Sequence, residues 1–396
     1  MENNEDLSAN QQLSKNEIIE KVLSKEYDFR FNTVKSRTEY RKKSTKSDFK
    51  TIDKYALHSI WRELYMQKLS CTPEVISSIL FSSFSPRIDP IKEYFLSLIP
   101  SQNGAIEALA KTVSTTNSAR WLEYFTRWIV GVTANNLCDD KCLNHTCLTL
   151  TGDQGALKTS FLELLNPMHN LGSGYLFTGS IDVHSKDMQS LMSEYMLINI
   201  DDQLKSLNLR DVNMLKTLIT LPKVKYRRPY DIFIEEYPHR ASFMASVNGI
   251  DFLCDESGSR RFLSFQVVSI DFETAKSINI NSVYENAMYL FNSGFRYWFN
   301  SEEIIELNIN NKPFHVQTTE YELLIKMFML PDDSNNTNIE YLTNTEILNL
   351  LQAHSTKQLD SKRLGEALKN ANFVRVSKRF NGNAPAYCYG VIRINP

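Results

Sequence analysis

A glycine-rich segment between two apolar runs has the residue types that bind phosphate. This glycine-rich loop reads Gly152-Asp153-Gln154-Gly155-Ala156-Leu157-Lys158-Thr159-Ser160 and follows the apolar run 147–150. The hydrophobic residues after it have helical spacing, so we expect it to connect a strand to a helix. Backbone N–H groups of such a loop can surround phosphate oxygens, Lys158 can reach the β- and γ-phosphates, and Thr159 can offer its hydroxyl to Mg²⁺. The segment therefore predicts that the chain binds ATP and Mg²⁺.

The glycine-rich loop departs from the pattern G-x-x-x-x-G-K-[ST] at one position. Leu157 stands where the pattern has a glycine directly before the lysine. A Cβ atom there would crowd a phosphate approach that glycine leaves open. Taken alone, the loop leaves two interpretations open, a nucleotide site and an ordinary connection between a strand and a helix.

Polar side chains follow two further strand candidates. Asp201 and Asp202 end the apolar run 196–200, and Asn248 ends the run 241–247. In a nucleotide site we expect Asp201 to hold Mg²⁺, Asp202 to act as the base toward the attacking water, and Asn248 to orient that water or contact the γ-phosphate. Asp pairs and Asn-Gly pairs are also common turn formers, so two turns are the alternative.

Arg260 and Arg261 lie between a turn and another apolar run, 262–263. Arginines at such a place suit phosphate, and one presented to the γ-phosphate of a neighbouring subunit would stabilise transition-state charge. The alternative is a pair of surface arginines whose charges balance those of the acidic residues just upstream.

The order of these motifs resembles the virulence-associated E family. The segments that carry the resemblance are the glycine-rich loop, Ile200-Asp201-Asp202, Lys216, Tyr226-Arg227-Arg228-Pro229-Tyr230, Arg240-Ala241-Ser242-Phe243, Ser246-Val247-Asn248, Phe252-Leu253-Cys254-Asp255 and Gly258-Ser259-Arg260-Arg261-Phe262-Leu263. They cover about residues 85 to 300. Family members usually have a glycine before the lysine, where this chain has Leu157, and often Asp-Glu where it has Asp201-Asp202.

The resemblance implies a fold and an activity. Members of the family are P-loop ATPases of phages, plasmids and pathogenicity islands, similar to superfamily-three helicases of the AAA+ type. It therefore implies a parallel-sheet α/β core, assembly as a homo-oligomeric, hexameric ring, and catalysis by Lys158, Asp202, Asn248 and an arginine, Arg260 or Arg261, acting on the neighbouring site.

Two β-rich runs between residues 221 and 240 predict a hairpin that is basic and aromatic. In superfamily-three helicases a hairpin at this place grips single-stranded DNA, so the resemblance implies phosphate contacts and stacking by Tyr226 or Tyr230. The cations assigned to the phosphates are Lys223, Lys225, Arg227 and Arg228. An edge hairpin kept soluble by its charges is the alternative.

Composition limits the class of protein. The chain has 396 residues, 42% hydrophobic and 23% charged, which is ordinary for a soluble globular protein of two or three domains. A net charge of −2 disfavours nonspecific coating of nucleic acid, so DNA contacts should come from local patches. No apolar run approaches 18 residues and the N-terminus is polar, so we expect a cytoplasmic protein without a membrane segment.

Six cysteines are scattered along the chain, and an intracellular location disfavours disulfides. Cys138, Cys142, His145 and Cys147 could bind zinc, but their spacing lacks the usual C-x₂-C pair. Small buried hydrophobic residues and a loop histidine are the favoured interpretation.

The flanking regions predict separate functions. We expect residues 1–100 to be mainly helical with a basic stretch at 35–50, either a DNA contact or a solvated face. Residues 101–300 would form the ATPase. Residues 301–396 predict a C-terminal winged-helix-like domain, with helices at 345–353 and 361–370 and two strands within 373–394, for binding DNA or protein.

The combined prediction is an ATP-dependent DNA helicase or translocase for replication of a phage or mobile element, working with a separate primase. Leu157 favours an alternative, an ATP-binding initiator or loader that hydrolyses ATP weakly and uses it as a switch.

Overall fold

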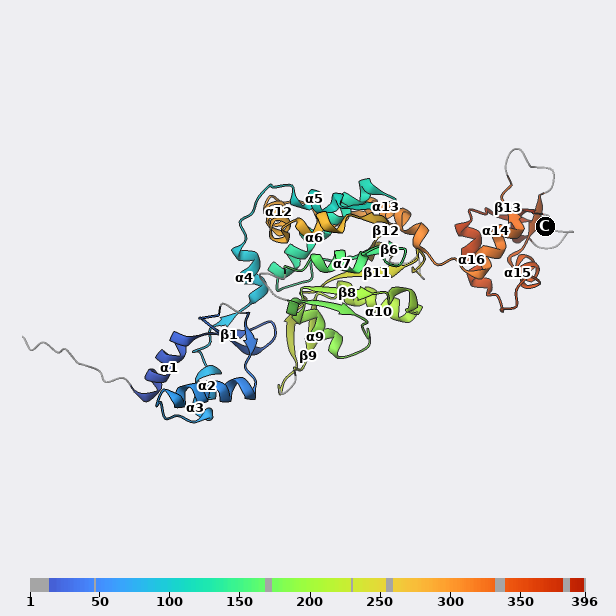
Figure 1. The fold of residues 1–396 in the computed structure, drawn as a ribbon. Helices are drawn as coiled ribbons and strands as arrows, with labels where there is room; N and C mark the ends of the chain where they lie inside the picture. Colours follow the sequence, from blue (N-terminus) through green and yellow to red (C-terminus); the bar gives the residue numbers. More distant parts are fainter. Residues whose placement is uncertain are drawn as a thin grey trace, which may run out of the picture. The chain divides into compact units, whose positions relative to one another are not determined.

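The structure is a computed structural model that describes residues 14–45, 48–167, 173–228, 231–253, 259–331, 339–379 and 385–394. The chain divides into two compact units, Met1–Pro313 and Phe314–Pro396. The first unit holds a central sheet with its helices and an N-terminal part, and the second is small (Figure 1).

The central sheet has the strand order β5-β12-β6-β11-β8-β7. β12, β6, β11, β8 and β7 pair in parallel, whereas β5 pairs with β12 in antiparallel fashion at one edge. The strands are β5 (Val113–Thr115), β6 (Cys147–Gly152), β7 (Leu176–Gly179), β8 (Leu197–Asp201), β11 (Ser242–Asn248) and β12 (Phe262–Ile270). This arrangement confirms the parallel α/β core expected from the sequence.

The inner strands are buried on both faces, as their apolar sequences require. Every residue of β6 is buried, and so are the first six residues of β11. Helix α6 (Ser118–Leu137) contributes the buried rings of Trp121, Phe125 and Trp128 to the same core. The rings of Trp121 and Phe125 lie 4.9 Å apart, so these aromatic residues pack in the core as expected.

Helices surround the sheet. Figure 1 shows α5 and α12 beside α6 on one side and α9 and α10 on the other. Besides α6, the described helices around the central sheet are α5 (Ala105–Lys111), α7 (Lys158–Leu164), α9 (Asp187–Glu194), α10 (Leu209–Thr220), α11 (Phe272–Ser277), α12 (Ile280–Asn292) and α13 (Ser301–Asn311). The 3₁₀ turns are η1 (Ser173–Tyr175), η2 (Leu204–Ser206), η3 (Ser259–Arg261) and η4 (Lys312–Phe314).

The N-terminal part combines helices with a small sheet of order β3-β2-β1-β4. We expected this part to be mainly helical, and the sheet is an addition to that prediction. Strand β1 does alternate aromatic and polar residues, whereas β2 carries charges on both faces and β3 and β4 have only two residues each, so the sheet as a whole gives little apolar alternation in sequence. The elements are α1 (Lys15–Glu26), β1 (Tyr27–Asn32), β2 (Arg37–Lys42), β3 (Lys50–Thr51), α2 (Lys54–Met66), α3 (Pro73–Leu80), β4 (Arg87–Ile88) and α4 (Pro90–Ser97).

Much of the basic stretch is paired with acids inside this N-terminal part. Arg41 lies 2.9 Å from Asp28, and Lys42 lies 2.6 Å from Glu63. Such pairs favour the interpretation as a solvated, ion-paired face over a dedicated DNA contact.

A hairpin precedes β11, as the sequence predicted. Strands β9 (Lys223–Tyr226) and β10 (Glu235–Pro238) pair in antiparallel fashion, with Lys225 opposite Glu236. In Figure 1 the β9 strand leads away from the central sheet.

The second unit packs its helices around Leu324, Ile347, Leu351, Leu364 and Leu368. Two helices and a hairpin lie where the sequence predicted them. The elements of this unit are α14 (Thr319–Met327), β13 (Phe328–Met329), β14 (Glu340–Leu342), α15 (Asn344–Gln352), α16 (Ser361–Asn370), β15 (Arg375–Lys378) and β16 (Ala386–Arg393).

Among the described residues of the chain, no helix combines the length and the apolar character needed to span a bilayer.

Candidate nucleotide-binding site

Three neighbouring strands bring the predicted site residues to one edge of the central sheet. β11 lies between β6 and β8, with Asn248 opposite Gly152 and Ser246 opposite Asp201. Because the carboxyl ends of parallel strands meet at one edge, the loops after them share one place, where α/β proteins bind ligands.

The backbone of the glycine-rich loop depends on Gly152 and Gly155. Gly152 has φ +136°, and a Cβ atom on it would lie 3.0 Å from the carbonyl oxygen of Val267. Its N–H and carbonyl each form a 3.1 Å hydrogen bond with Gly249. Gly155 has φ +85°, a conformation that side-chain-bearing residues rarely adopt.

Leu157 adopts a left-handed backbone in spite of its Cβ atom. Its φ is +57° and ψ is 21°, and 45% of the residue is exposed. This conformation costs a residue other than glycine about 1 kcal/mol. The loop therefore keeps the conformation that glycine would favour at this position, with some strain and with an exposed side chain.

Lys158 is folded into the loop. It is 5% exposed, and its ammonium group donates hydrogen bonds to the carbonyls of Gly152 at 3.1 Å and Asp153 at 2.6 Å and to Oδ1 of Asn248 at 3.3 Å. Burial lowers the pKa of Lys158, and the nearby carboxylates of Asp202, Asp153 and Asp201 oppose that shift. The ammonium group thus lies within a ring of oxygen atoms at the strand edge.

Thr159, Asp201 and Ser246 form a cluster of hydroxyl and carboxylate oxygens. The Thr159 hydroxyl lies 2.8 Å from Oδ1 of Asp201 and 3.0 Å from Oγ of Ser246. The Ser246 hydroxyl also donates to Oδ1 of Asp201. Hard oxygen donors of this kind are the ligands that Mg²⁺ prefers.

Asp202 and Asn248 form a second, adjoining pair. Asp202 has φ +51°, and its two carboxylate oxygens accept hydrogen bonds from the backbone N–H of Asn248 at 2.9 Å and from its amide Nδ2 at 2.7 Å. Strained backbone of this type occurs often at functional sites. Because Asn248 also contacts Lys158, the three side chains form one continuous polar chain.

Arg260 and Arg261 belong to a different pocket. This pocket has a volume of about 550 Å³, and its lining residues come from η3, α10 and α13. No described residue of the glycine-rich loop lines it. Lys216 lines the same pocket, and no acidic residue is among its described lining. Burial, and secondarily the charge of Arg260, lowers the pKa of Arg261. The structure therefore groups three cations in a pocket that the described residues of the glycine-rich loop do not line.

The predicted DNA cations of the hairpin differ in their availability. Lys223 and Lys225 both form ion pairs with Glu236, at 3.0 and 3.1 Å. Arg228 donates to the Val34 carbonyl at 2.8 Å and stacks on the Tyr237 ring.

Arg227 is exposed. Of the predicted stacking residues, Tyr226 packs against Tyr237 with ring centroids 4.8 Å apart, and Tyr230 lies outside the described residues.

Two of the three cysteines in the cluster are buried, as the favoured interpretation predicts, and Cys138 is partly exposed. Cys142 and Cys147 are buried, and burial raises the pKa of each thiol to about 12. Nε2 of His145 is 3.0 Å from the Cys142 carbonyl oxygen. In the described part of the chain, no group of three or more His, Cys, Asp or Glu side chains is arranged for a metal ion.

Residue type and spacing alone do not identify two residues of these sites, Ser246 and Glu236. Ser246 is a common residue in an apolar run, and only its place two residues before Asn248, on the same face of the strand, could have indicated it. Glu236 could be placed beside the lysines only with the register of the hairpin.

The fold defines an α/β protein with a parallel sheet, in which a glycine-rich loop connects β6 to α7. The model of the virulence-associated protein E-like domain matches residues 101–316, more than half of the chain. The chain belongs to this family, as the resemblance of its motifs predicted.

One solved structure shows a similar fold at low sequence identity. The structure described as the apo NrS-1 C-terminal region (305–718) has a TM-score of 0.50 and 12% identity, and the match covers 96% of this chain and 100% of that one. A second structure of that region, the A form, has a TM-score of 0.49 with 12% identity and the same coverage. No curated protein matches the sequence.

Proposed function

We propose that the protein is an ATP-dependent DNA helicase or translocase that acts in the replication of a phage or mobile genetic element. The observation that carries this proposal is the convergence of Lys158, Thr159, Asp201, Asp202 and Asn248 at the ends of three adjacent strands. Turns alone would not require a lysine, a hydroxyl, two carboxylates and an amide to meet at the edge where α/β sheets bind ligands. Membership of the virulence-associated protein E-like family supports the same activity.

The contacts within the site support a role for each residue. Lys158 would exchange the carbonyls of Gly152 and Asp153 for phosphate oxygens of ATP. Thr159 and Asp201, with Ser246 beside them, would hold Mg²⁺, which neutralises charge on the β- and γ-phosphates when bound.

Asp202 would take the proton of the attacking water. Asn248, which holds both carboxylate oxygens of Asp202, would fix the direction of that carboxylate.

The pocket of Arg260, Arg261 and Lys216 supports assembly of several copies. An arginine that stabilises transition-state charge must reach the γ-phosphate, and these arginines lie in a pocket apart from their own glycine-rich loop. A neighbouring copy in a hexameric ring would bring its nucleotide to them. The three cations of this pocket then complement the charge of ATP.

DNA would be contacted by the hairpin and by the second unit, which we interpret as a winged helix. Lys362, Arg363 and Lys369 are exposed on α16, the helix that would lie against DNA in such a domain.

Leu157 favours a second candidate function, an ATP-dependent switch with weak hydrolysis. Its Cβ atom occupies a left-handed position that glycine would fill without strain. If that atom displaces the γ-phosphate, ATP would bind without efficient turnover.

Strand displacement from a forked DNA duplex distinguishes the two functions. We expect ATP-dependent displacement by the wild-type protein and none by Asp202→Asn, which retains a polar side chain of the same size. Binding of ATP by Asp202→Asn is the control for an intact site. ATP binding by the wild-type protein with no displacement and no turnover would favour the switch.

A further inference from the structure

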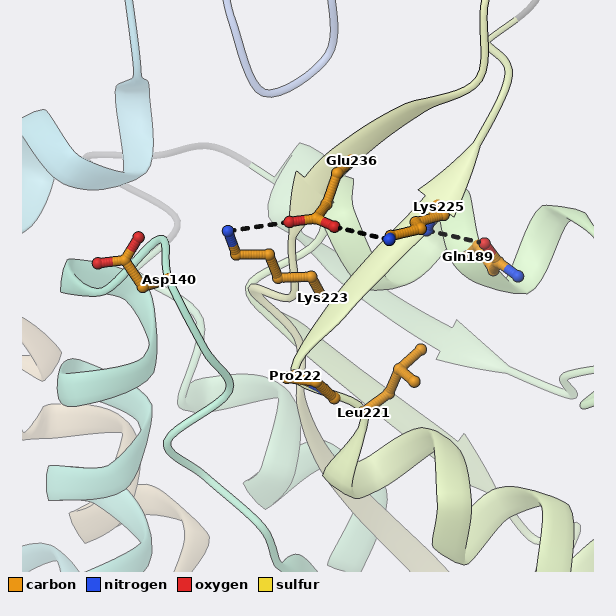
Figure 2. A pocket seen from close by; sticks show the side chains of 7 residues that line it. All are labelled: Asp140, Gln189, Leu221, Pro222, Lys223, Lys225 and Glu236. Carbon is orange, nitrogen blue, oxygen red and sulfur yellow. Dashed lines mark hydrogen bonds and ion pairs between the residues drawn. The ribbon is translucent and has the colours of Figure 1, made fainter.

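Lys205 is an exposed lysine that the roles proposed above do not use. It lies on the turn η2, three residues after Asp202. Within the described part of the chain, no carboxylate forms an ion pair with it. Lys223 and Lys225 differ in this respect, because Figure 2 shows their ammonium groups on either side of the Glu236 carboxylate. The charge of Lys205 is therefore available to a ligand.

The ammonium group of Lys205 lies over the first residue after β11. A Cβ atom on Gly249 would lie 3.1 Å from Nζ of Lys205. Gly249 forms two 3.1 Å backbone hydrogen bonds with Gly152, where the glycine-rich loop begins, and it directly follows Asn248. The ammonium group thus lies beside the contact that joins the end of β11 to the glycine-rich loop.

The turn η2 is held in place on both sides of Lys205. Leu204 is 2% exposed, so it anchors the turn in the core. The side-chain amide of Gln203 donates to the Ile181 carbonyl at 2.7 Å and accepts from the Ile181 N–H at 2.7 Å. The Ser206 hydroxyl donates to the Gln203 carbonyl at 2.8 Å. Only the flexible side chain of Lys205 would therefore need to move toward a ligand.

The charges at this edge of the sheet favour a second cation beside a nucleotide. Asp153, Asp201 and Asp202 are the carboxylates near the ammonium group of Lys158. Three negative charges stand against one positive charge, so this group of side chains is net negative. ATP remains anionic with Mg²⁺ bound, and a cation over Gly249 would reduce its repulsion from these carboxylates.

We propose that Lys205 is a second phosphate-binding lysine of the nucleotide site and that its ammonium group contacts the γ-phosphate of ATP. The inference rests on the proposed function, because it adds a residue to the same site. The γ-phosphate is the group beside which Asp202 and Asn248 would act, and Lys205 lies next to both. Lysine binds phosphate as a point charge with three N–H donors. Because ADP lacks the γ-phosphate, Lys205 would distinguish ATP from ADP.

The test compares Lys205→Ala with Lys21→Ala in the full chain. Both variants remove one exposed lysine, but Lys21 lies on α1, whose buried residues belong to the core of the N-terminal part. Calorimetric titration in the presence of Mg²⁺ measures the binding of ADP and of AMP-PNP, a non-hydrolysable ATP analogue. Lys158→Ala shows whether this binding takes place at the glycine-rich loop, because it should lose both nucleotides.

We expect Lys205→Ala to bind AMP-PNP about tenfold more weakly than the wild type, because it loses a charge-assisted hydrogen bond to the γ-phosphate. Its affinity for ADP should stay at the wild-type value. Lys21→Ala should bind both nucleotides as the wild type does. Thermal unfolding of Lys205→Ala should match that of the wild type, since only an exposed side chain is removed.

The other outcomes overturn the inference in distinguishable ways. Equal weakening of ADP and AMP-PNP binding would contradict a contact with the γ-phosphate. A loss in Lys21→Ala as large as that in Lys205→Ala would show a general effect of charge.

Unchanged AMP-PNP affinity of Lys205→Ala, with binding intact in the wild type and lost in Lys158→Ala, would reject the role of Lys205 and leave the nucleotide site standing. Absence of nucleotide binding by the wild type would reject both the inference and the proposed function.

Discussion

Leu157 is the residue at which this chain departs most clearly from a phosphate-binding loop. The backbone at Leu157 is left-handed, and the side chain is partly exposed rather than packed in the core. Its Cβ atom therefore adds strain without the stabilisation that a buried leucine would provide. A functional site can retain such strain when the surrounding structure holds the conformation in place.

Replacing Leu157 by glycine should remove this strain. We expect Leu157→Gly to keep or raise the free energy of unfolding, by up to about 1 kcal/mol, and to bind ATP more tightly. Leu157→Ala is the matched control, because it removes the side-chain bulk but keeps the Cβ atom. Chemical denaturation and ATP titration measure both effects. Weaker ATP binding and lower stability in Leu157→Gly would contradict this explanation.

The residue types of the site were largely predictable from sequence, but their connections were not. Asp201 and Asn248 end their strands, and Lys158 and Thr159 begin α7 after the loop that follows β6, so the order of apolar runs already indicated a shared edge. The shared hydrogen bonds of Ser246 with Thr159 and Asp201 depend on strand register. Register arises from pairing between distant segments, which residue spacing alone does not specify.

At the level of secondary-structure elements, the β9–β10 hairpin gives different surroundings to Arg227 and Arg228, two arginines that look equivalent in sequence. Arg227 is exposed, whereas Arg228 donates to the Val34 carbonyl and stacks on Tyr237 at 4.1 Å from the ring centre. The two side chains should therefore have different functions, one toward DNA and the other toward the hairpin's own position.

Separate alanine variants should reveal this difference. We expect Arg227→Ala to weaken binding of single-stranded DNA and its stimulation of turnover, with basal turnover and thermal stability unchanged. Arg228→Ala should lower the free energy of unfolding by about 1–2 kcal/mol, since it loses a charge-assisted hydrogen bond and a cation–π contact. Anisotropy and thermal unfolding measure the two effects. Equal loss of DNA binding without loss of stability in Arg228→Ala would place Arg228 on the DNA.

The turn from β10 to β11 contains a buried histidine that should make stability depend on pH. His239 is 1% exposed, its Nδ1 lies 2.6 Å from the Leu221 carbonyl oxygen, and burial lowers its pKa to about 4. The folded protein thus keeps His239 neutral at pH values where an unfolded histidine, with a pKa near 6.5, takes up a proton.

Because only the unfolded chain gains that proton, the stability contributed by His239 is complete above about pH 6.5 and is lost as pH falls toward 4. The loss amounts to at most about 3 kcal/mol over this window. His239→Asn keeps an N–H donor but does not titrate there. Urea unfolding at several pH values should show the wild type losing more stability than the variant, and parallel curves would contradict the assignment.

The elements of the N-terminal part show where a sequence pattern fails. Strand β2 reads Arg-Thr-Glu-Tyr-Arg-Lys and has no apolar face, yet Glu39 within it is 6% exposed and lies 2.7 Å from Arg30. The burial of Glu39 depends on this ion pair with Arg30 across the sheet, and hydrophobic periodicity does not detect such a pair. Helix α1, with a capping box of Ser14 and Glu17, was predictable because its signals are local.

At the scale of the whole molecule, a single copy presents its arginines and its glycine-rich loop at different places. The pocket of Arg260, Arg261 and Lys216 has no lining residue from that loop. A complete hydrolytic site would then need two copies, so catalysis and assembly would be coupled. Variants that remove different halves of the site should complement one another.

A mixing experiment tests this coupling. Lys158→Ala and the double variant Arg260→Ala, Arg261→Ala should each be inactive alone. In a random equal mixture, roughly a quarter of the interfaces would combine an intact lysine with an intact arginine pair, so a similar fraction of turnover should return. Turnover that stays absent after mixing, with assembly confirmed by size-exclusion chromatography, would contradict arginines acting in a neighbouring site.

Steady-state ATP hydrolysis with and without single-stranded DNA, with Lys158→Ala as the control, tests whether this sheet edge hydrolyses ATP. We expect turnover that DNA increases. We expect Lys158→Ala to lose that turnover, because the Lys158 ammonium group would bind the β- and γ-phosphates. Turnover of the wild type that equals that of Lys158→Ala, in both the presence and absence of DNA, would contradict the assignment of this edge as the hydrolytic site.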